Sequence, residues 1–167
     1  MITDTNDNHA EINNRISDCI VTANRLKLFW NKANTTIKWK LQVYDSMIRS
    51  KLLYGLETIQ LTQNEKERIN AFQMKGIRRI LQIPPTHIDR TQTNELVMKQ
   101  ASKEADKKDG KSIMKFTDMW LKLKLKLLGH LLRAHWSDPL HQVTFENSSK
   151  KPGYQSKEDQ EDQETNG

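Results

Sequence analysis

Apolar residues recur at the spacing of an α-helix along most of this chain, and this periodicity does most to limit how the chain can fold. In the segment 10–32 the apolar positions are Ile12, Ile16, Cys19, Ile20, Ala23, Leu26 and Trp30. In the segment 36–54 they are Ile37, Leu41, Tyr44, Ile48 and Leu52. Each set falls on one side of a helix, and Gly55 follows the second set as a helix stop. The pattern predicts two amphipathic helices over 10–32 and 36–54.

A capping box and a proline pair delimit a third helix. Thr62 and Glu65 have the spacing at which each side chain bonds the other residue's backbone amide, so the helix begins after Thr62. It ends before Pro84-Pro85, because neither ring can donate a hydrogen bond and the first disfavours helical geometry at the residue before it. After a loop, Thr93 is expected to cap a fourth helix over 94–105.

The segment 120–128, WLKLKLKLL, alternates apolar and charged residues as a strand does. We nevertheless predict a helix, because Lys and Leu favour helices over strands. At 100° per residue, one helical arc of about 60° collects Lys111, Lys115, Lys122, Lys126 and Arg133, and Lys124 is the one residue out of place. Leucines and aromatic residues fill most of the remaining circumference.

These elements predict an all-α fold, a bundle of four to five helices with a disordered C-terminal tail. We expect a flexible N-terminus over 1–9, a helical region over 10–102, a charged linker over 103–112, a C-terminal helical region over 113–145 and a disordered tail over 146–167. The linker and the tail are predicted from their low content of apolar residues.

The chain is basic, with a formal net charge of +6. From Ser156 onward there are five acidic residues and one lysine, so the rest carries about +10. Such a balance favours phosphate-bearing partners, although solubility alone could explain it. The N-terminus is polar and no apolar run reaches the length of a membrane span, so we expect an intracellular protein, nuclear or cytoplasmic, with no membrane partner. The single cysteine, Cys19, lies among apolar residues and is interpreted as a buried structural thiol.

The sequence carries no recognisable catalytic motif. A polymerase needs closely placed carboxylates to hold two metal ions, and no Asp-Asp pair occurs here. Glu-Asp pairs occur only in the acidic tail. There is no Walker loop and no dinucleotide-binding glycine motif, and the histidines lack partners at metal-ligand spacing. We therefore expect no enzyme activity from this chain, no cofactor and no metal.

Rows of cationic residues are the remaining functional signal. On the third helix Arg68, Lys75 and Arg79 fall within about 40° of one another, and Arg78 flanks them. On the fifth helix the corresponding residues are Lys115, Lys122, Lys126 and Arg133. Such rows can follow a phosphate backbone, and each can equally be a solvated face. Trp39 and Trp136 could stack on bases, whereas Trp30 and Trp120 fall on core faces.

Short motifs in a fixed order resemble the segment that follows the catalytic palm in reverse transcriptases of LINE-type (non-LTR) retrotransposons. The central match is Leu52-Leu53-Tyr54-Gly55, Glu57-Thr58, Leu61-Thr62, Phe72 and Arg78-Arg79-Ile80-Leu81. Upstream it includes Glu11-Ile12, Arg15-Ile16, Lys40, Tyr44, Ser46 and Ser50. Downstream it includes Asp89-Arg90, Thr93-Asn94-Glu95, Leu128-Gly129-His130 and Arg133. The family's Glu-Thr-Trp tryptophan is Ile59 here, and Gly76 stands where a cysteine or bulky residue is common.

This resemblance implies a fragment with the non-catalytic role of a polymerase thumb. In the family that region is a helical bundle that rides on the template–primer duplex. The expected function is therefore sequence-independent binding of RNA or an RNA–DNA duplex through the basic helix faces. The parent family's RNA-directed DNA polymerase activity would need the missing palm. The alternatives are a helical protein-interaction module and an inactive retroelement remnant.

Overall fold

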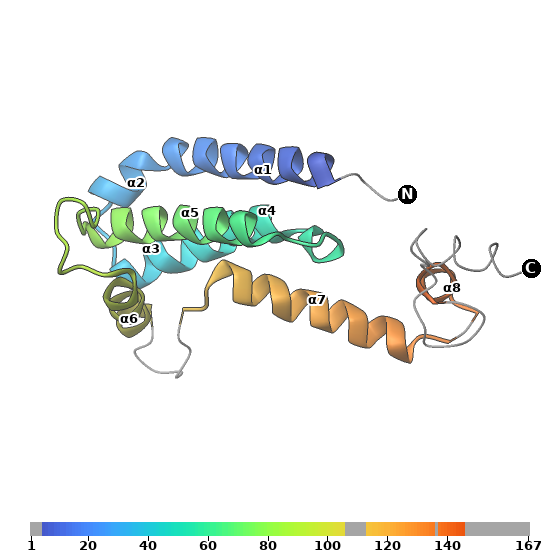
Figure 1. The fold of residues 1–167 in the computed structure, drawn as a ribbon. Coiled ribbons are helices and arrows are strands. Elements are labelled where there is room, and N and C mark those ends of the chain that lie inside the picture. The colour runs from blue at the N-terminus through green and yellow to red at the C-terminus, as the bar shows by residue number, and fades with distance from the viewer. Residues whose placement is uncertain (1–4, 106–112, 136, 146–167) are drawn as a thin grey trace, which may run out of the picture. The chain divides into compact units, whose positions relative to one another are not determined.

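All regular secondary structure in the described part of the chain is helical, which confirms the predicted all-α class (Figure 1). The computed structural model describes residues 5–105, 113–135 and 137–145. The chain forms two compact units that divide after Lys122, inside a helix. The sequence places its boundary earlier, in the charged segment 103–112. Residues 106–112 of that segment and the predicted tail over 146–167 lie outside the described residues.

The first predicted helix is two helices, and it begins earlier than expected. Helix α1 spans Thr5–Arg25 and α2 spans Lys27–Lys32, with a break at Leu26. The indole of Trp30 donates to the carbonyl of Ala23 at 2.8 Å, the acceptor that the amide of Lys27 would use in an unbroken helix. The last five residues of the segment 1–9, for which flexibility was predicted, belong to this helix. His9 holds this turn in place, since its ring nitrogens lie 3.6 Å from Glu65 Oε1 and 3.2 Å from Arg68 Nη1.

The second predicted helix contains a π-helical turn. It comprises α3 (Ile37–Tyr44), the π segment η1 (Asp45–Arg49) and α4 (Ser50–Leu53). Gly55 ends it with a φ of 71°, which confirms the predicted glycine stop. A short 3-10 turn, η2 (Leu56–Thr58), follows. The thiol of Cys19 is fully buried and lies 3.8 Å from the carbonyl oxygen of Ile48, and burial raises its pKa to about 11. The prediction of a structural thiol is confirmed.

Helix α5 (Gln63–Leu81) is the centre of the first unit. Its capping box is formed as predicted, with the Thr62 hydroxyl accepting from the amide of Glu65 and the Glu65 carboxylate accepting from the amide of Thr62. It ends at Gln82, which adopts the left-handed conformation with a φ of 57°. Helix α6 (Asn94–Ala105) starts after Thr93, whose hydroxyl accepts from the amide of Leu96. Its last turn extends into the predicted linker.

The core of the first unit is built around aromatic rings from three segments. Tyr44 stacks on Phe116 with ring centroids 6.1 Å apart, and meets Trp30 edge-on at 6.2 Å. Buried Gln73 on α5 donates to the carbonyl of Met114 and accepts from the amide of Phe116, both at 2.9 Å. These bonds fix the start of the next helix against α5.

That helix, α7 (Phe116–Arg133), confirms the helical reading of the alternating segment. In the first unit its residues Phe116 and Trp120 are buried, and the Trp120 indole donates to the carbonyl of Leu56 at 2.9 Å. In the second unit α7 is followed by α8 (Pro139–Thr144). None of the helices in the described residues is long and apolar enough to cross a membrane.

Candidate nucleic-acid interface

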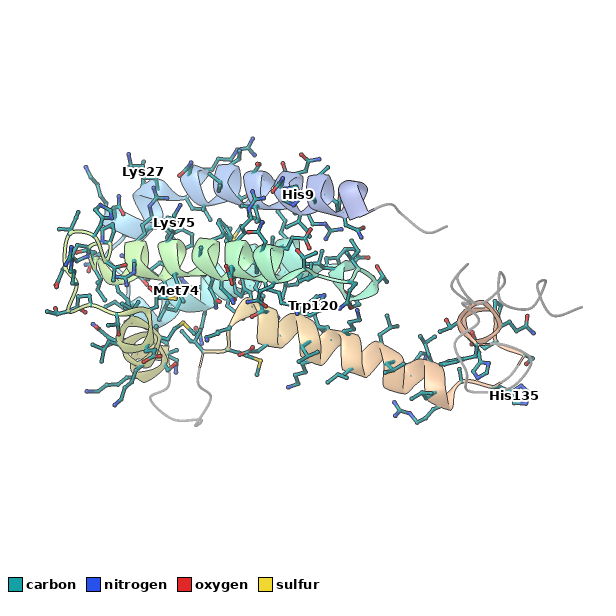
Figure 2. All side chains as sticks on the ribbon, viewed as in Figure 1. His9, Lys27, Met74, Lys75, Trp120 and His135 are labelled. Carbon is teal, nitrogen blue, oxygen red and sulfur yellow. The ribbon has the colours of Figure 1, made fainter. Side chains whose placement is uncertain are left out.

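Helix α5 turns one face to the core and another towards α1. The predicted apolar arc is buried as expected, with Ile69, Ile77 and Ile80 at most 3% exposed. Figure 2 shows Lys75 on the side of α5 that faces α1, and Met74 on the opposite side. Arg68, Lys75 and Arg79 are all exposed. We call these three residues the α5 row.

Side chains of α1 contact the two ends of the α5 row. Arg68 Nη1 lies 3.2 Å from Nε2 of His9, and the guanidinium of Arg79 donates to Oδ1 of Asn24 at 3.1 Å. His9 and Asn24 are near opposite ends of α1, so α1 and α5 run side by side in the same direction (Figure 1). Within the described residues, none of the three cations forms an ion pair with a carboxylate. Their charge is therefore available to an anionic partner.

Arg78, predicted as a phosphate contact, does not belong to this exposed surface. The side chain is only 7% exposed. Its guanidinium donates to the carbonyls of Pro84 and Gln92, both at 2.7 Å, and to Oδ1 of Asn94 at 3.0 Å. The loop after α5 folds back over this residue, and three of its five N–H donors are used in these bonds, so Arg78 holds the loop in place. Helical spacing alone does not reveal the path of a loop.

The second predicted row is exposed but divided between the two units. Lys115 and Lys122 are exposed in the first unit, and Lys126 and Arg133 are exposed in the second. Each is thus open to solvent as expected. Of the two undecided tryptophans, Trp39 is 54% exposed and Trp136 lies outside the described residues.

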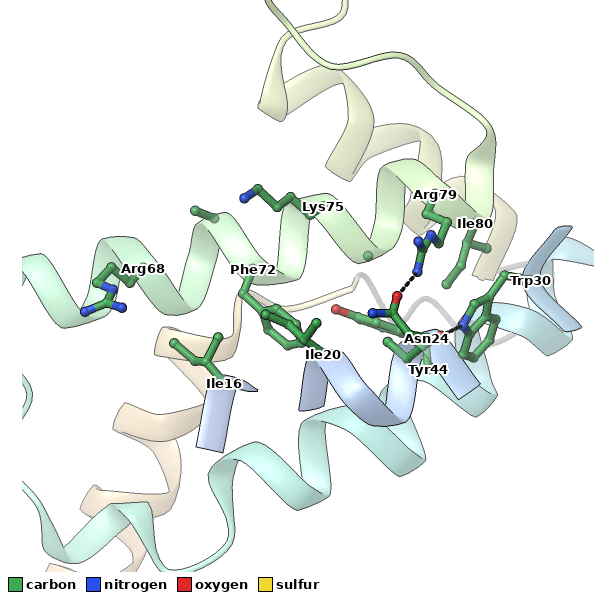
Figure 3. A pocket seen from close by; sticks show the side chains of 13 residues that line it. Ile16, Ile20, Asn24, Trp30, Tyr44, Arg68, Phe72, Lys75, Arg79 and Ile80 are labelled. Carbon is green, nitrogen blue, oxygen red and sulfur yellow. Dashed lines mark hydrogen bonds between the residues drawn. The ribbon is translucent and has the colours of Figure 1, made fainter. Parts of the chain in front are cut away.

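A pocket of about 600 Å³ lies between α1 and α5, next to the α5 row (Figure 3). Its apolar lining includes Ile16 and Ile20 from α1, Phe72 and Ile80 from α5, and the rings of Trp30 and Tyr44. All three cations of the α5 row line it as well. Sequence reasoning found the row and missed the pocket, since the pocket depends on how α1 packs beside α5.

Tyr44 gives this pocket an unusual polar atom. Its side chain is 4% exposed, and burial raises its pKa above the ordinary value for tyrosine. The hydroxyl has no hydrogen-bond partner among the described residues. It lies against Gly76, where an added Cβ would be 2.2 Å from the hydroxyl oxygen. The glycine that looked like a departure from the family pattern therefore makes room for this ring.

The described residues thus form an all-α module with an unpaired cationic row beside an apolar pocket. Among them, no group of three His, Cys, Asp or Glu side chains is placed to hold a metal ion. The chain matches no protein-family model, and neither the curated proteins nor the solved structures contain a match.

Proposed function

We propose that this chain binds RNA or an RNA–DNA duplex through the phosphate backbone, in the manner of a polymerase thumb. The motifs that resemble LINE-type reverse transcriptases support this proposal, and the palm carboxylates needed for polymerisation are absent from the sequence. The chain would therefore hold nucleic acid without catalysing a reaction, in the nucleus or the cytoplasm. The partner is a nucleic acid, and the proposal requires neither metal nor cofactor.

The α5 row is the observation that carries this proposal. Its first and last cations are eleven residues apart on one helix, or about 16 Å along the helix axis. A nucleic-acid backbone presents several phosphates over that length. Arginine can bind a phosphate through two parallel hydrogen bonds, whereas lysine contributes a point charge. Lys115 and Lys122, and separately Lys126 and Arg133, are the second set of candidate contacts.

The test is a fluorescence-anisotropy titration of a labelled RNA–DNA hybrid. The variant reverses the α5 row, with Arg68, Lys75 and Arg79 each replaced by Glu. The matched control reverses Arg90, Lys99 and Lys103, which are also exposed and change the net charge by the same amount. We expect the α5 variant alone to lose most of its affinity. The slope of log affinity against log salt should also fall by about 2.7 for three lost phosphate contacts.

Equal losses in both triple variants would refute the role of the α5 row, because they would show that only net charge matters. Binding by the wild type that does not change with salt would refute phosphate recognition altogether.

The alternative, a helical protein-interaction module, is favoured by one observation. On α7 in the second unit, Leu125 and Leu128 are 57% and 43% exposed. Exposed apolar side chains that recur on one helix are typical of surfaces that bind other proteins. Absence of any binding to the hybrid would favour this alternative, or an inactive retroelement remnant.

A further inference from the structure

We propose that the pocket between α1 and α5 binds an anionic amphiphile, a molecule with a hydrocarbon body and a single carboxylate or phosphate head. This ligand class goes beyond nucleic-acid binding, although it would use two of the same cations. Pockets for small molecules typically have volumes of 300–1,000 Å³ and mostly apolar walls with few polar groups. The volume of about 600 Å³ and the lining described above fit that description.

The walls of the pocket select a hydrocarbon body. Ile16 and Ile20 of α1 face Phe72 of α5 across it (Figure 3). Ile20 is 44% exposed, so a ligand could remove its apolar surface from water. A nucleobase would bring several donors and acceptors, and few polar groups on these walls could meet them. A hydrocarbon chain or an unsubstituted ring leaves no such group unsatisfied.

The head group is selected by Lys75 and Arg79. These residues are four apart on α5, which places neighbouring side chains about 6 Å from each other on one helix face. Two cations at that distance can hold one carboxylate or phosphate between them. Arg68 lies two helical turns before Lys75 and is beyond the reach of the same head group. Lys75 has no hydrogen bond or ion pair within the described residues, so its ammonium can take up a ligand without breaking a contact.

Tyr44 is the second, independent observation that points to a ligand. Its hydroxyl is buried at the pocket wall and lacks a hydrogen-bond partner among the described residues, which is costly for a polar group. Asn24 and the indole N–H of Trp30 are the other neutral polar groups of the lining, and both are already bonded, to Arg79 and to the carbonyl of Ala23. A ligand oxygen that reached the phenol would satisfy the Tyr44 hydroxyl.

The test uses isothermal titration calorimetry with laurate, dodecyl phosphate and dodecyltrimethylammonium. The hydrocarbon tails of the three probes differ by at most one carbon, since the twelve carbons of laurate include its carboxylate, so the main difference is the head group. We expect binding of laurate and dodecyl phosphate, and affinity at least about tenfold weaker for the cationic probe. Equal affinity for the cationic and anionic probes would overturn the proposal, because the α5 cations would then play no part. Failure of all three to bind would overturn it as well.

Variants locate the site and separate this proposal from nucleic-acid binding. Lys75→Met should weaken laurate binding about tenfold, whereas Lys99→Met, the same change at an exposed residue of α6, should leave it unchanged. Ile20→Gln should weaken laurate binding severalfold without changing affinity for the RNA–DNA hybrid, since it alters no charge. Equal effects at positions 75 and 99, or no effect at position 20, would place the ligand elsewhere. The two proposals can therefore be refuted independently: loss of laurate binding leaves binding of the RNA–DNA hybrid untouched, and absence of hybrid binding leaves laurate binding untouched.

Discussion

Gly76 is a helix-interior glycine whose replacement by alanine should destabilise the protein, against the usual trend. In a solvated helix Gly→Ala stabilises by about 1 kcal/mol. Here the added Cβ would lie 2.2 Å from the Tyr44 hydroxyl oxygen, 2.3 Å from Cζ and 2.5 Å from Cε2. Ordinary carbon contacts are about 3.5–4.0 Å, so the ring would have to move by roughly 1 Å or more. The sign of the effect depends on whether Tyr44 can make that movement.

The surroundings of Tyr44 oppose the movement. The ring stacks on Phe116 and meets Trp30 edge-on, so a shift away from Gly76 disturbs two further core rings. Over-packing of a core costs about 1–3 kcal/mol, and overlap with three atoms of one ring points to the upper end. After the gain in helix propensity, the net loss in unfolding free energy for Gly76→Ala is about 2 kcal/mol. In a chain of this length, that lowers the melting temperature by roughly 4–8 °C.

The assay is urea denaturation followed by far-ultraviolet circular dichroism, with two controls. Gly129 also lies in a helix, but its added Cβ would meet only the movable guanidinium of Arg133 among its nearest atoms, at 3.3 Å. Gly129→Ala should therefore be neutral or stabilising by up to about 1 kcal/mol. Tyr44→Leu removes the ring, so the double variant with Gly76→Ala should lose at least about 1 kcal/mol less than the sum of the single losses. If Gly76→Ala stabilised the protein as much as Gly129→Ala, the close approach of Tyr44 to α5 would be refuted.

Two further predictions concern neighbouring and buried groups. Arg78→Ala should lower the unfolding free energy by about 3 kcal/mol, because two loop carbonyls and the side chain of the first residue of α6 lose their donor. Arg79→Ala should leave stability within about 0.5 kcal/mol and weaken binding to the RNA–DNA hybrid. Similar stability losses in the two variants, measured by urea denaturation, would contradict this assignment. Burial raises the pKa of Cys19 to about 11, so the thiol stays protonated at pH 9 in the folded protein. A thiol reagent at pH 9 should therefore label Cys19 no faster than the protein unfolds. Rapid labelling without denaturant would contradict this prediction, because it would show that the thiol is accessible.

Helix type and several boundaries followed from periodicity and caps, whereas the division of the first two predicted helices into shorter elements did not. The capping box at Thr62, the stop at Gly55 and the cap at Thr93 are local signals, and each is formed in the structure. The break at Leu26 was not predictable in this way. It depends on the indole of Trp30 reaching the carbonyl of Ala23, a contact that the apolar pattern does not encode. The early start of α1 likewise depends on His9 meeting Glu65 and Arg68 from another helix.

Several residues that carry the family resemblance have structural roles here. Tyr44 is a core ring, and Lys40 is buried and donates to the carbonyl of Trp30 at 2.9 Å. Arg15 donates to Glu11 and to the carbonyl of Tyr54, which joins α1 to the end of α4. A pattern built from such residues reports on how helices pack. It therefore bears on the packing of these helices more directly than on the binding of nucleic acid.

The two neighbouring arginines at the end of α5 have different roles, although the sequence predicted the same role for both. Arg78 and Arg79 stand side by side in one motif, and a helix turns them only about 100° apart. Arg78 is enclosed by the loop that follows α5, whereas Arg79 bonds Asn24 of α1 and stays exposed. Charge in the sequence is therefore insufficient to define an interface. The candidates that remain are exposed cations that form no ion pair within the described residues, and in the first unit the α5 row meets that condition beside an apolar pocket.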